Sequence, residues 1–550
     1  MPKEKVYASF PLAPFFVLIK KRGSYNKTMK DNNRLQDLSS PKPSQPSVAL
    51  TATIVTALSV AERFLGFLYR MVLSHFIGAE GVGVYQISLS LFAVFLTIGT
   101  GGIPITVSRL IAKSKAQGSA KGERAALSAG MLCTLIITLP VAILLGLFAD
   151  KLPFLFTDMR CVESFRILLC GLVFSCVYAV VRGFFWGNDN LLIPSILEIA
   201  EESVMVLCGV FLLQSATSPL DGANKAALSA TLSYLFSFGV SILLLFVKGG
   251  RLSSPKRALK PLISAAAPVT GVRMGNSFIQ SAVAVLLPAA LVRAGMSQSE
   301  ALGVYGAISG MALPVLFIPA TIIGSLALVL APKLSKAYYQ KDKKTLYSHL
   351  QKGIKTSLVT CCFLLPFFSV FGREIGLLCF AEPLAGEYIR SASPLLLPMG
   401  VAMITTSMLN ALGKEKHTFL YNFIGAAALL ICVLFLPSLL GGYAYLLGMG
   451  VNFFLGALCN LILLCKTCPK LLSFPSLKGE LKALILLFPL SLVGEWIYLL
   501  FGRFLGAWSA LILSGIILAL LSVLSYLIFG VIRVQSVFLR KKGKKERSHA

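Results

Sequence analysis

Charged residues are scarce in this sequence. Asp, Glu, Lys and Arg make up 13% of its 550 residues, whereas 56% are hydrophobic, and the mean hydropathy is +0.80. Because soluble globular domains carry about 25% charged residues, this composition excludes a water-soluble enzyme or binding module. It predicts an all-α integral membrane protein, since a helix satisfies its own backbone hydrogen bonds within a bilayer.

Acidic residues are few compared with basic ones, 23 against 51, which leaves a formal net charge of +28. A basic surplus of this size can indicate nucleic-acid binding. Here, however, Lys and Arg gather in short segments between apolar runs rather than on an amphipathic face. We therefore expect no nucleic-acid partner and attribute the surplus to loops on one side of a membrane.

Catalytic and cofactor motifs are also missing. The four histidines are scattered along the chain, and no Walker A sequence for a nucleotide is present. The twelve cysteines lie mostly within apolar runs, where cysteine behaves as a small hydrophobic residue. We therefore expect no enzyme, no cofactor and no metal site. Coupling to Na⁺, H⁺ or the membrane potential stays open.

Apolar segments long enough to span a bilayer recur along the chain. Fourteen are expected, at about 50–76, 82–112, 125–149, 164–186, 192–214, 225–248, 260–293, 303–332, 353–371, 389–412, 416–438, 442–465, 480–501 and 506–532. With this count, the basic clusters at 109–124, 248–260 and 333–344 and the tail from Arg540 to Arg547 fall on one side. The positive-inside rule then places both termini in the cytoplasm.

The chain is expected to contain two pseudo-symmetric six-helix lobes and two C-terminal helices. The predicted parts are a cytoplasmic polar leader at 1–47, an N-lobe at 48–250, a C-lobe at 251–470, the last two helices at 471–533 and a basic cytoplasmic tail at 534–550.

An internal repeat favours two lobes. Gly83-Val84-Tyr85 recurs as Gly303-Val304-Tyr305, and each copy leads into an apolar helix that Gly and Pro interrupt. Interrupted helices at matching positions of two halves point to a transport site at their interface. We therefore assign four residues to helix breaks or gating: Gly101, Gly102, Pro104 and Pro319.

Arginines stand inside the apolar runs of both halves. Arg63 and Arg70 are seven residues apart, so they share a helix face about 10 Å apart along the axis. In the seventh segment, Asn276 and Gln280 continue the face of Arg273 at i+3 and i+7. Because a guanidinium facing lipid is costly, we expect these faces to line a protein interior or a wet cavity.

Planar arginine donors suit a diphosphate. The candidate substrate-binding residues are therefore Arg63, Arg70, Arg273, Asn276 and Gln280. The alternative interpretation is that each arginine neutralises a neighbouring carboxylate, with Glu62 and Glu201 available.

Three acids lie in the fifth apolar segment. Glu198, Glu201 and Glu202 share one side of the helix, and Arg182 at the end of the fourth segment is expected at a similar depth. We interpret the group as a structural clip between two helices. The alternative is a proton or sodium site that couples transport, since intramembrane carboxylates commonly serve that role.

Several motifs of the apolar regions form a characteristic set: the run 62–70 (Glu-Arg-Phe-Leu-Gly-Phe-Leu-Tyr-Arg), the run 77–86, Thr100-Gly101-Gly102-Ile103-Pro104, Arg182-Gly183-Phe184-Phe185-Trp186-Gly187, Glu201 and the stretch 299–314. Together they resemble the motifs of the stage V sporulation protein B family. The resemblance covers nearly all of residues 50–530. This family is similar to the lipid II flippases and oligosaccharide-lipid flippases of the multidrug/oligosaccharidyl-lipid/polysaccharide exporter (MOP) superfamily, which includes the MATE drug exporters.

The resemblance implies a MATE-like, two-lobed fold that alternates between inward-open and outward-open states, with Arg63 in its central cavity. It also implies a flippase in the bacterial plasma (inner) membrane that moves an anionic polyprenyl-diphosphate-linked glycan precursor to the outer leaflet. The precursor would be lipid II-like or a polysaccharide repeat unit, for peptidoglycan cell-wall, spore-cortex or polysaccharide biosynthesis.

The expected partners are this lipid-linked oligosaccharide, membrane lipids and envelope-synthesis enzymes. Two other functions stay open. A cation-coupled multidrug antiporter of the same fold should carry carboxylates where this chain has Arg63 and Arg273. A membrane scaffold for envelope synthases would transport nothing.

Overall fold

The computed structural model of the chain describes residues 48–151, 156, 158–469 and 474–531, and these ranges contain helices and no strand. The predicted leader and basic tail lie outside the described residues. The longer helices are α1 (Val48–Thr100), α2 (Ile103–Ala116), α3 (Ala120–Phe148), α4 (Cys161–Gly187), α5 (Leu192–Leu213), α6 (Pro219–Val247), α7 (Lys256–Arg293), α10 (Ile318–Tyr339), α11 (Lys343–Phe380), α13 (Leu396–Ala411), α14 (Glu415–Phe435), α16 (Tyr443–Thr467), α17 (Phe474–Phe501) and α18 (Ala507–Ile528). The shorter ones are η2 (Ala149–Lys151), α8 (Gln298–Tyr305), the π-helix η4 (Gly306–Ala312), α9 (Leu313–Leu316), α12 (Pro383–Ala392), η5 (Ser393–Leu395) and α15 (Pro437–Leu440).

Thirteen helices of the described ranges are long and apolar enough to cross a membrane. The all-α membrane class is therefore confirmed, whereas the count of fourteen stays a prediction. The first two predicted segments run together from Ile54 to Ala116, and the eighth is divided at Phe317. α5 is not among the thirteen, and it carries the three glutamates that lower its apolar character.

Gly78 explains why the first two segments form one continuous element. Its φ of 64° and ψ of −176° interrupt the helical geometry of α1 without a loop. A residue with a Cβ avoids this backbone conformation, whereas glycine adopts it readily. The sequence predicts a short connection there, and a single glycine provides it.

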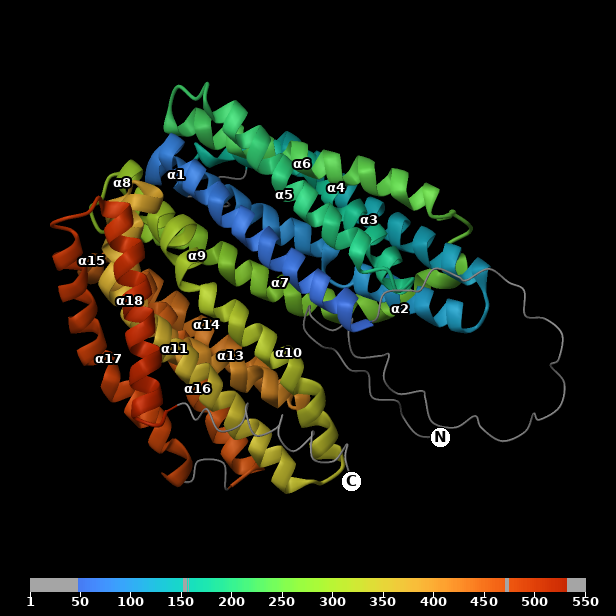
Figure 1. Cartoon of the computed structure of the whole chain (residues 1–550). Helices are drawn as coiled ribbons and strands as arrows, with labels where there is room; N and C mark the ends of the chain where they lie inside the picture. Colours follow the sequence, from blue (N-terminus) through green and yellow to red (C-terminus); the bar gives the residue numbers. More distant parts are fainter. Residues whose placement is uncertain (1–47, 152–155, 157, 470–473, 532–550) are drawn as a thin grey trace, which may run out of the picture.

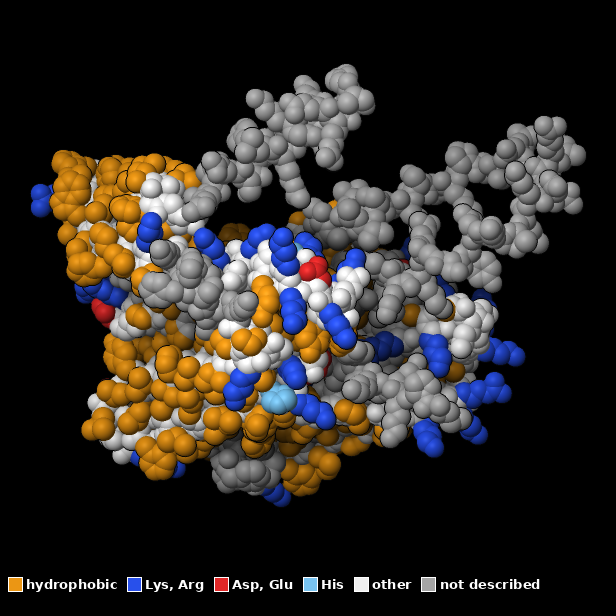
Figure 2. All heavy atoms as spheres, turned by 90° about the horizontal axis from the view of Figure 1, so that it is seen from below, with side chains coloured by type: hydrophobic (Ala, Val, Ile, Leu, Met, Phe, Trp, Pro, Cys, Tyr) orange, Lys and Arg blue, Asp and Glu red, His pale blue; other side chains and the backbone are white. Residues whose placement is uncertain are grey.

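The basic clusters are more helical than the sequence predicts. α2 carries Lys113 and Lys115 in its last turn, and only residues 117–119 connect it to α3. α10 likewise continues to Tyr339, with Lys336 in its last turn. These cations lie where the negative end of the helix dipole favours them. Figure 2 shows Lys and Arg side chains gathered on the face seen there, with few acidic side chains among them.

The helices form two groups, which Figure 1 shows next to each other. α1–α6 pack mainly on one another. α10, α11, α13, α14 and α16 form the second group, with α17 and α18 packed on α11 and with α8, η4, α9 and α12 linked to it through the contact of α12 with α11. α7 contacts both groups. Ala258, Leu262 and Ala266 near its start are buried in an apolar core with residues of α2, α3 and α4, whereas the helix also contacts α8 and α14.

The groups meet most tightly near Gly83 of α1. A Cβ at Gly83 would overlap the carbonyl oxygen of Leu302, and a Cβ at Gly306 would overlap that of Ala79. The two copies of the Gly-Val-Tyr repeat therefore lie together, backbone against backbone. We call this region, formed by residues 79–83 and 302–306, the closed end.

Arg160 adds polar contacts at the closed end. Its Nη1 donates to Glu80 Oε1 at 2.7 Å and to Ser299 Oγ at 3.3 Å, and its Nη2 lies 2.7 Å from Asp158 Oδ2. The hydrogen bond to Asp158 is the main reason why the pKa of Arg160 is raised. Because Ser299 precedes α8's Gly-Val-Tyr copy, Arg160 links the two groups of helices.

Candidate functional site

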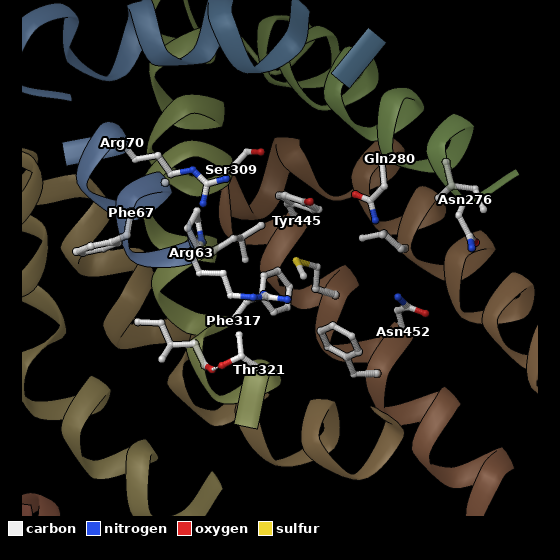
Figure 3. Close-up of a pocket in the computed structure, with 18 of the residues that line it drawn as sticks. Arg63, Phe67, Arg70, Asn276, Gln280, Ser309, Phe317, Thr321, Tyr445 and Asn452 are labelled. Carbon is white, nitrogen blue, oxygen red and sulfur yellow. Dashed lines mark hydrogen bonds between the residues drawn. The ribbon is translucent and has the colours of Figure 1, made fainter. Parts of the chain in front are cut away.

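A cavity of about 790 Å³ lies between the two groups of helices. Its walls come from α1, α5 and α7 on one side and from η4, α9, α10, α14 and α16 on the other. Figure 3 shows its polar and aromatic side chains directed toward a common space. Beside this space, α10, α13, α14 and α16 make little direct contact with α1–α6.

α1 contributes the positive charge of the cavity. Arg63, Gly66 and Arg70 all line it, as their spacing of three and four residues along one helix face requires. In Figure 3, Arg63 and Arg70 extend from α1 toward Ser309, Phe317 and Tyr445 of the opposite group. Neither arginine forms an ion pair or hydrogen bond within the part of the chain that the structure describes.

Two carboxylates share the cavity with these arginines. Glu62 neighbours Arg63 on α1, and Glu202 reaches the cavity from α5. Gly66 makes room for Glu202, because a Cβ at Gly66 would stand 3.0 Å from Glu202 Oε1. Glu202 therefore lies beside the α1 face midway between the two arginines, although neither carboxylate comes within ion-pair distance of them.

Uncharged polar groups line the remaining walls. Asn276 and Gln280 come from α7, and Asn422 and Asn452 come from α14 and α16. Figure 3 places Gln280, Asn276 and Asn452 around one side of the space. Sequence reasoning missed Asn422 and Asn452, because an amide in an apolar helix usually bonds a neighbouring helix. Nothing in their local sequence separates a cavity amide from such a residue.

Arg273 is not among the cavity's lining residues. It is partly buried on α7, three residues before Asn276, and makes no ion pair within the described ranges. The structure thus brings Arg63, Arg70, Asn276 and Gln280 together and leaves Arg273 beside them.

Arg182 has a different environment from the cavity arginines. Its Nη1 lies 2.7 Å from Glu198 Oε1, and its guanidinium carbon lies 4.9 Å from the centre of the Trp186 ring. This ion pair joins the end of α4 to α5, across the turn that connects the two helices. Glu201 Oε2, by contrast, is buried and has no hydrogen-bond partner among the residues that the structure describes.

Helix boundaries lie next to the residues assigned to helix breaks, with Pro104 in the first turn of α2, and their role in gating stays a prediction. α1 ends at Thr100 and α2 begins at Ile103, so Gly101 and Gly102 separate the two helices. A Cβ at Gly102 would overlap the Ala266 carbonyl oxygen of α7. In the second group, Pro319 stands in the first turn of α10, two residues after Phe317 of the cavity wall.

A family model described as "Polysaccharide biosynthesis protein" matches residues 50–338. The chain belongs to this family. Stage V sporulation protein B of Bacillus subtilis (strain 168) is 25% identical over 391 residues, which cover 68% of this chain and 74% of that protein. Lipid II flippase MurJ of the same organism is 21% identical over 429 residues, which cover 70% of this chain and 76% of that protein.

Solved structures of the MOP superfamily share the fold. Lipid II flippase MurJ in an inward closed conformation matches with a TM-score of 0.68 and 15% identity over 89% of this chain and 99% of that one. The inward-facing conformation of a multidrug resistance MATE family transporter matches with a TM-score of 0.63 and 15% identity over 76% of this chain and 98% of that one. The expected resemblance to this superfamily is therefore confirmed.

Proposed function

We propose that this protein is a flippase that carries an anionic polyprenyl-diphosphate-linked glycan precursor from the inner to the outer leaflet of a bacterial plasma membrane. The observation that carries the proposal is the pair of arginines, Arg63 and Arg70, that face the cavity without a partner among the described residues. The family and the similarity to a lipid II flippase support it.

A diphosphate fits the chemistry of this cavity. A guanidinium presents planar N–H donors that match phosphate oxygens, and charge-assisted hydrogen bonds of this kind are about twice as strong as neutral ones. Asn276, Gln280 and Asn452 offer amide groups suited to the hydroxyls of a sugar. The polyprenyl chain, which is apolar, would stay in the lipid.

The position of the closed end supports alternating access as the proposed mechanism. The closed end holds the groups together, whereas α10, α13, α14 and α16 make little contact with α1–α6 elsewhere. Rocking of the two groups would separate the Gly83 and Gly306 backbones and bring the other ends together. The bound headgroup would then face the opposite side of the membrane.

Glu202 is the carboxylate best placed to couple transport to a cation. It lies beside Gly66, between Arg63 and Arg70 on α1. An ionised Glu202 opposes a bound diphosphate, whereas a protonated or Na⁺-bound Glu202 does not. Replacement Glu202→Gln should keep substrate binding and remove its dependence on the ion.

The carboxylates also support a second candidate, a cation-coupled multidrug antiporter. Glu62 and Glu202 line the same cavity as the arginines, and a cationic drug would bind them. In that case the double replacement Glu62→Gln and Glu202→Gln would abolish drug binding, and replacement of the arginines would strengthen it.

Native mass spectrometry of the purified protein tests the proposal. The wild type should retain a polyprenyl-diphosphate glycolipid, and the double variant Arg63→Ala, Arg70→Ala should bind it at least about 100-fold more weakly, at about 1.5–3 kcal/mol for each of two lost charged hydrogen bonds. Arg373→Ala, a mostly exposed arginine outside the cavity, is the matched control. Equal retention by the double variant and this control would contradict the proposal.

Thiol labelling separates transport from a scaffold role. The variant Asn276→Cys, in a background without the native cysteines, should react from both sides of the membrane when the substrate is present. Labelling from one side alone would favour the scaffold.

A further inference from the structure

A second cavity, of about 390 Å³, lies at the ends of α3, α4 and α6 and shares no lining residue with the arginine cavity. Three of its lining residues are basic: Arg124, Lys248 and Arg251. They belong to two of the basic clusters seen in the sequence, which the fold brings together here.

The segment that joins α6 to α7 forms one wall of this cavity. Lys248 follows the last residue of α6, and Gly249, with a φ of 81°, turns the chain. The Ser253 amide donates to Ser128 Oγ of α3 at 2.8 Å, which holds the segment against that helix. Phe184 and Phe185 of α4 are buried and line the cavity.

The basic side chains lack acidic partners within the described part of the protein. Arg124, Lys248 and Arg251 form no ion pair with any other residue that the structure describes. The nearby carboxylate of Asp189 is occupied by Lys115, whose Nζ lies 3.2 Å away. Glu123 is the one carboxylate among the lining residues, so the lining carries three positive charges and one negative charge.

Asn190 adds an oriented donor. Its Oδ1 accepts a hydrogen bond from the Ile193 amide at 3.2 Å, so its amide nitrogen is the group left to donate into the cavity. Arginine, lysine and an amide nitrogen together form a set of donors that suits a small anion with several oxygens.

We propose that this cavity binds an anionic phosphate group, which acidic phospholipid headgroups and free phosphate share. Its position favours a headgroup, because Leu243, Phe246 and Val247, just before Lys248, are exposed apolar side chains on α6. Acyl chains would lie along this surface while the phosphate reaches the basic residues. The proposal is independent of the flippase function, since it uses none of the arginine cavity.

Thermal-shift titration of the full-length protein in detergent tests the proposal, because a ligand that binds the folded state raises the Tm. The probes are dihexanoyl-phosphatidylglycerol, the zwitterionic dihexanoyl-phosphatidylcholine and inorganic phosphate. The double variant Arg124→Ala, Arg251→Ala should bind phosphatidylglycerol at least about tenfold more weakly than the wild type. Lys343→Ala, Lys344→Ala, in a basic cluster outside the cavity, should leave the affinity unchanged.

Glu123→Gln provides a second readout in which affinity should rise, because it removes the carboxylate that opposes the anion. This variant keeps the proposal testable if the double variant fails to fold. Tighter binding of phosphatidylglycerol than of phosphatidylcholine identifies a lipid headgroup, and an equal effect of inorganic phosphate identifies the free anion. Equal binding of both lipids by all variants, with no effect of phosphate, would overturn the proposal.

Discussion

The closed end and the arginine cavity lie on the same interface, yet their polar groups are used differently. At the closed end, Arg160 has Asp158, Glu80 and Ser299 as partners, and Gly83 meets the backbone of the other group. In the cavity, Arg63 and Arg70 have no partner among the described residues. The first region joins the two groups of helices, whereas the second leaves two guanidinium groups unpaired among the described residues, as the proposed substrate site requires.

This difference teaches that two arginines of one protein are distinguished by their partners, so a paired arginine is expected to act in stability and an unpaired one in the proposed ligand binding. A buried charge that loses its partner destabilises the fold, whereas removal of an unpaired charge relieves a desolvation cost. Replacement of an arginine at the closed end should therefore lower the stability of the fold and leave ligand binding unchanged. Replacement of a cavity arginine should weaken ligand binding and leave the stability nearly unchanged.

The largest difference is expected between Arg182 and Arg63, because Arg182 is a paired arginine inside the first group of helices and Arg63 is unpaired. Arg182→Ala leaves Glu198 without its ion-pair partner and should lower the free energy of unfolding by about 2–4 kcal/mol. Arg63→Ala should change it by less than about 1 kcal/mol. Unfolding of both purified variants in denaturant measures the two values, and equal losses would break the distinction.

Gly83 tests the backbone packing of the closed end. Gly83→Ala places a Cβ on the Leu302 carbonyl oxygen and should cost about 1–3 kcal/mol as the groups are forced apart. Gly303→Ala is the matched control in the other copy of the repeat, because its nearest neighbour, the Ala79 Cβ, is 3.9 Å from the added methyl. The measurements are the Tm and the rate at which a thiol reagent labels a cysteine introduced at the closed end. Similar behaviour of the two variants would contradict this packing.

Arg160 tests the polar link across the closed end. Arg160→Ala removes the contact to Ser299 and leaves Asp158, which is buried, without its ion pair. The free energy of unfolding in denaturant should fall by about 1 kcal/mol, because the Arg160 side chain is about one-third exposed and solvent screens its ion pairs. Glycolipid binding in the cavity should not weaken. A variant that binds the lipid less tightly would show that the two regions are not independent.

The smallest effect on stability is expected for Asp342. This residue lies at the N-terminus of α11, far in sequence from the closed end and from the α1 arginines. Its carboxylate accepts hydrogen bonds from Thr345, and these lower its pKa. The contribution to stability is thus present above the usual pKa of about 3.9 and disappears as the pH falls through the lowered value. The Tm difference between wild type and Asp342→Ala should vanish in acid and persist at neutral pH.

Much of this arrangement could be predicted because charges and prolines are conspicuous in apolar runs. Arg63 and Arg70 mark a polar helix face, and Gly101, Gly102 and Pro319 mark interrupted helices. The sequence could not give the depth at which a long helix crosses the cavity. Counting along α7 suggested Arg273 as a lining residue, but the lining on α7 begins at Asn276.

Contacts between distant segments were beyond local sequence patterns. The Gly-Val-Tyr repeat indicated two similar halves, yet nothing in it showed that Gly83 and Gly306 touch. The room that Gly66 leaves for Glu202 likewise depends on how α1 and α5 pack. The convergence of Arg124 with Lys248 and Arg251 depends on the path of the connection between α6 and α7.

The prolines inside α7 affect how easily this helix bends. It contains Pro261, Pro268 and Pro288, and a proline has no N–H for the carbonyl four residues earlier, which lowers the resistance of a helix to bending. Pro268 stands between the part of α7 buried with α2–α4 and the part that carries Asn276 and Gln280. A bend at Pro268 would therefore change the angle between two parts of α7 that are buried in different apolar cores, the first with α2–α4 and the second with α1 and α8.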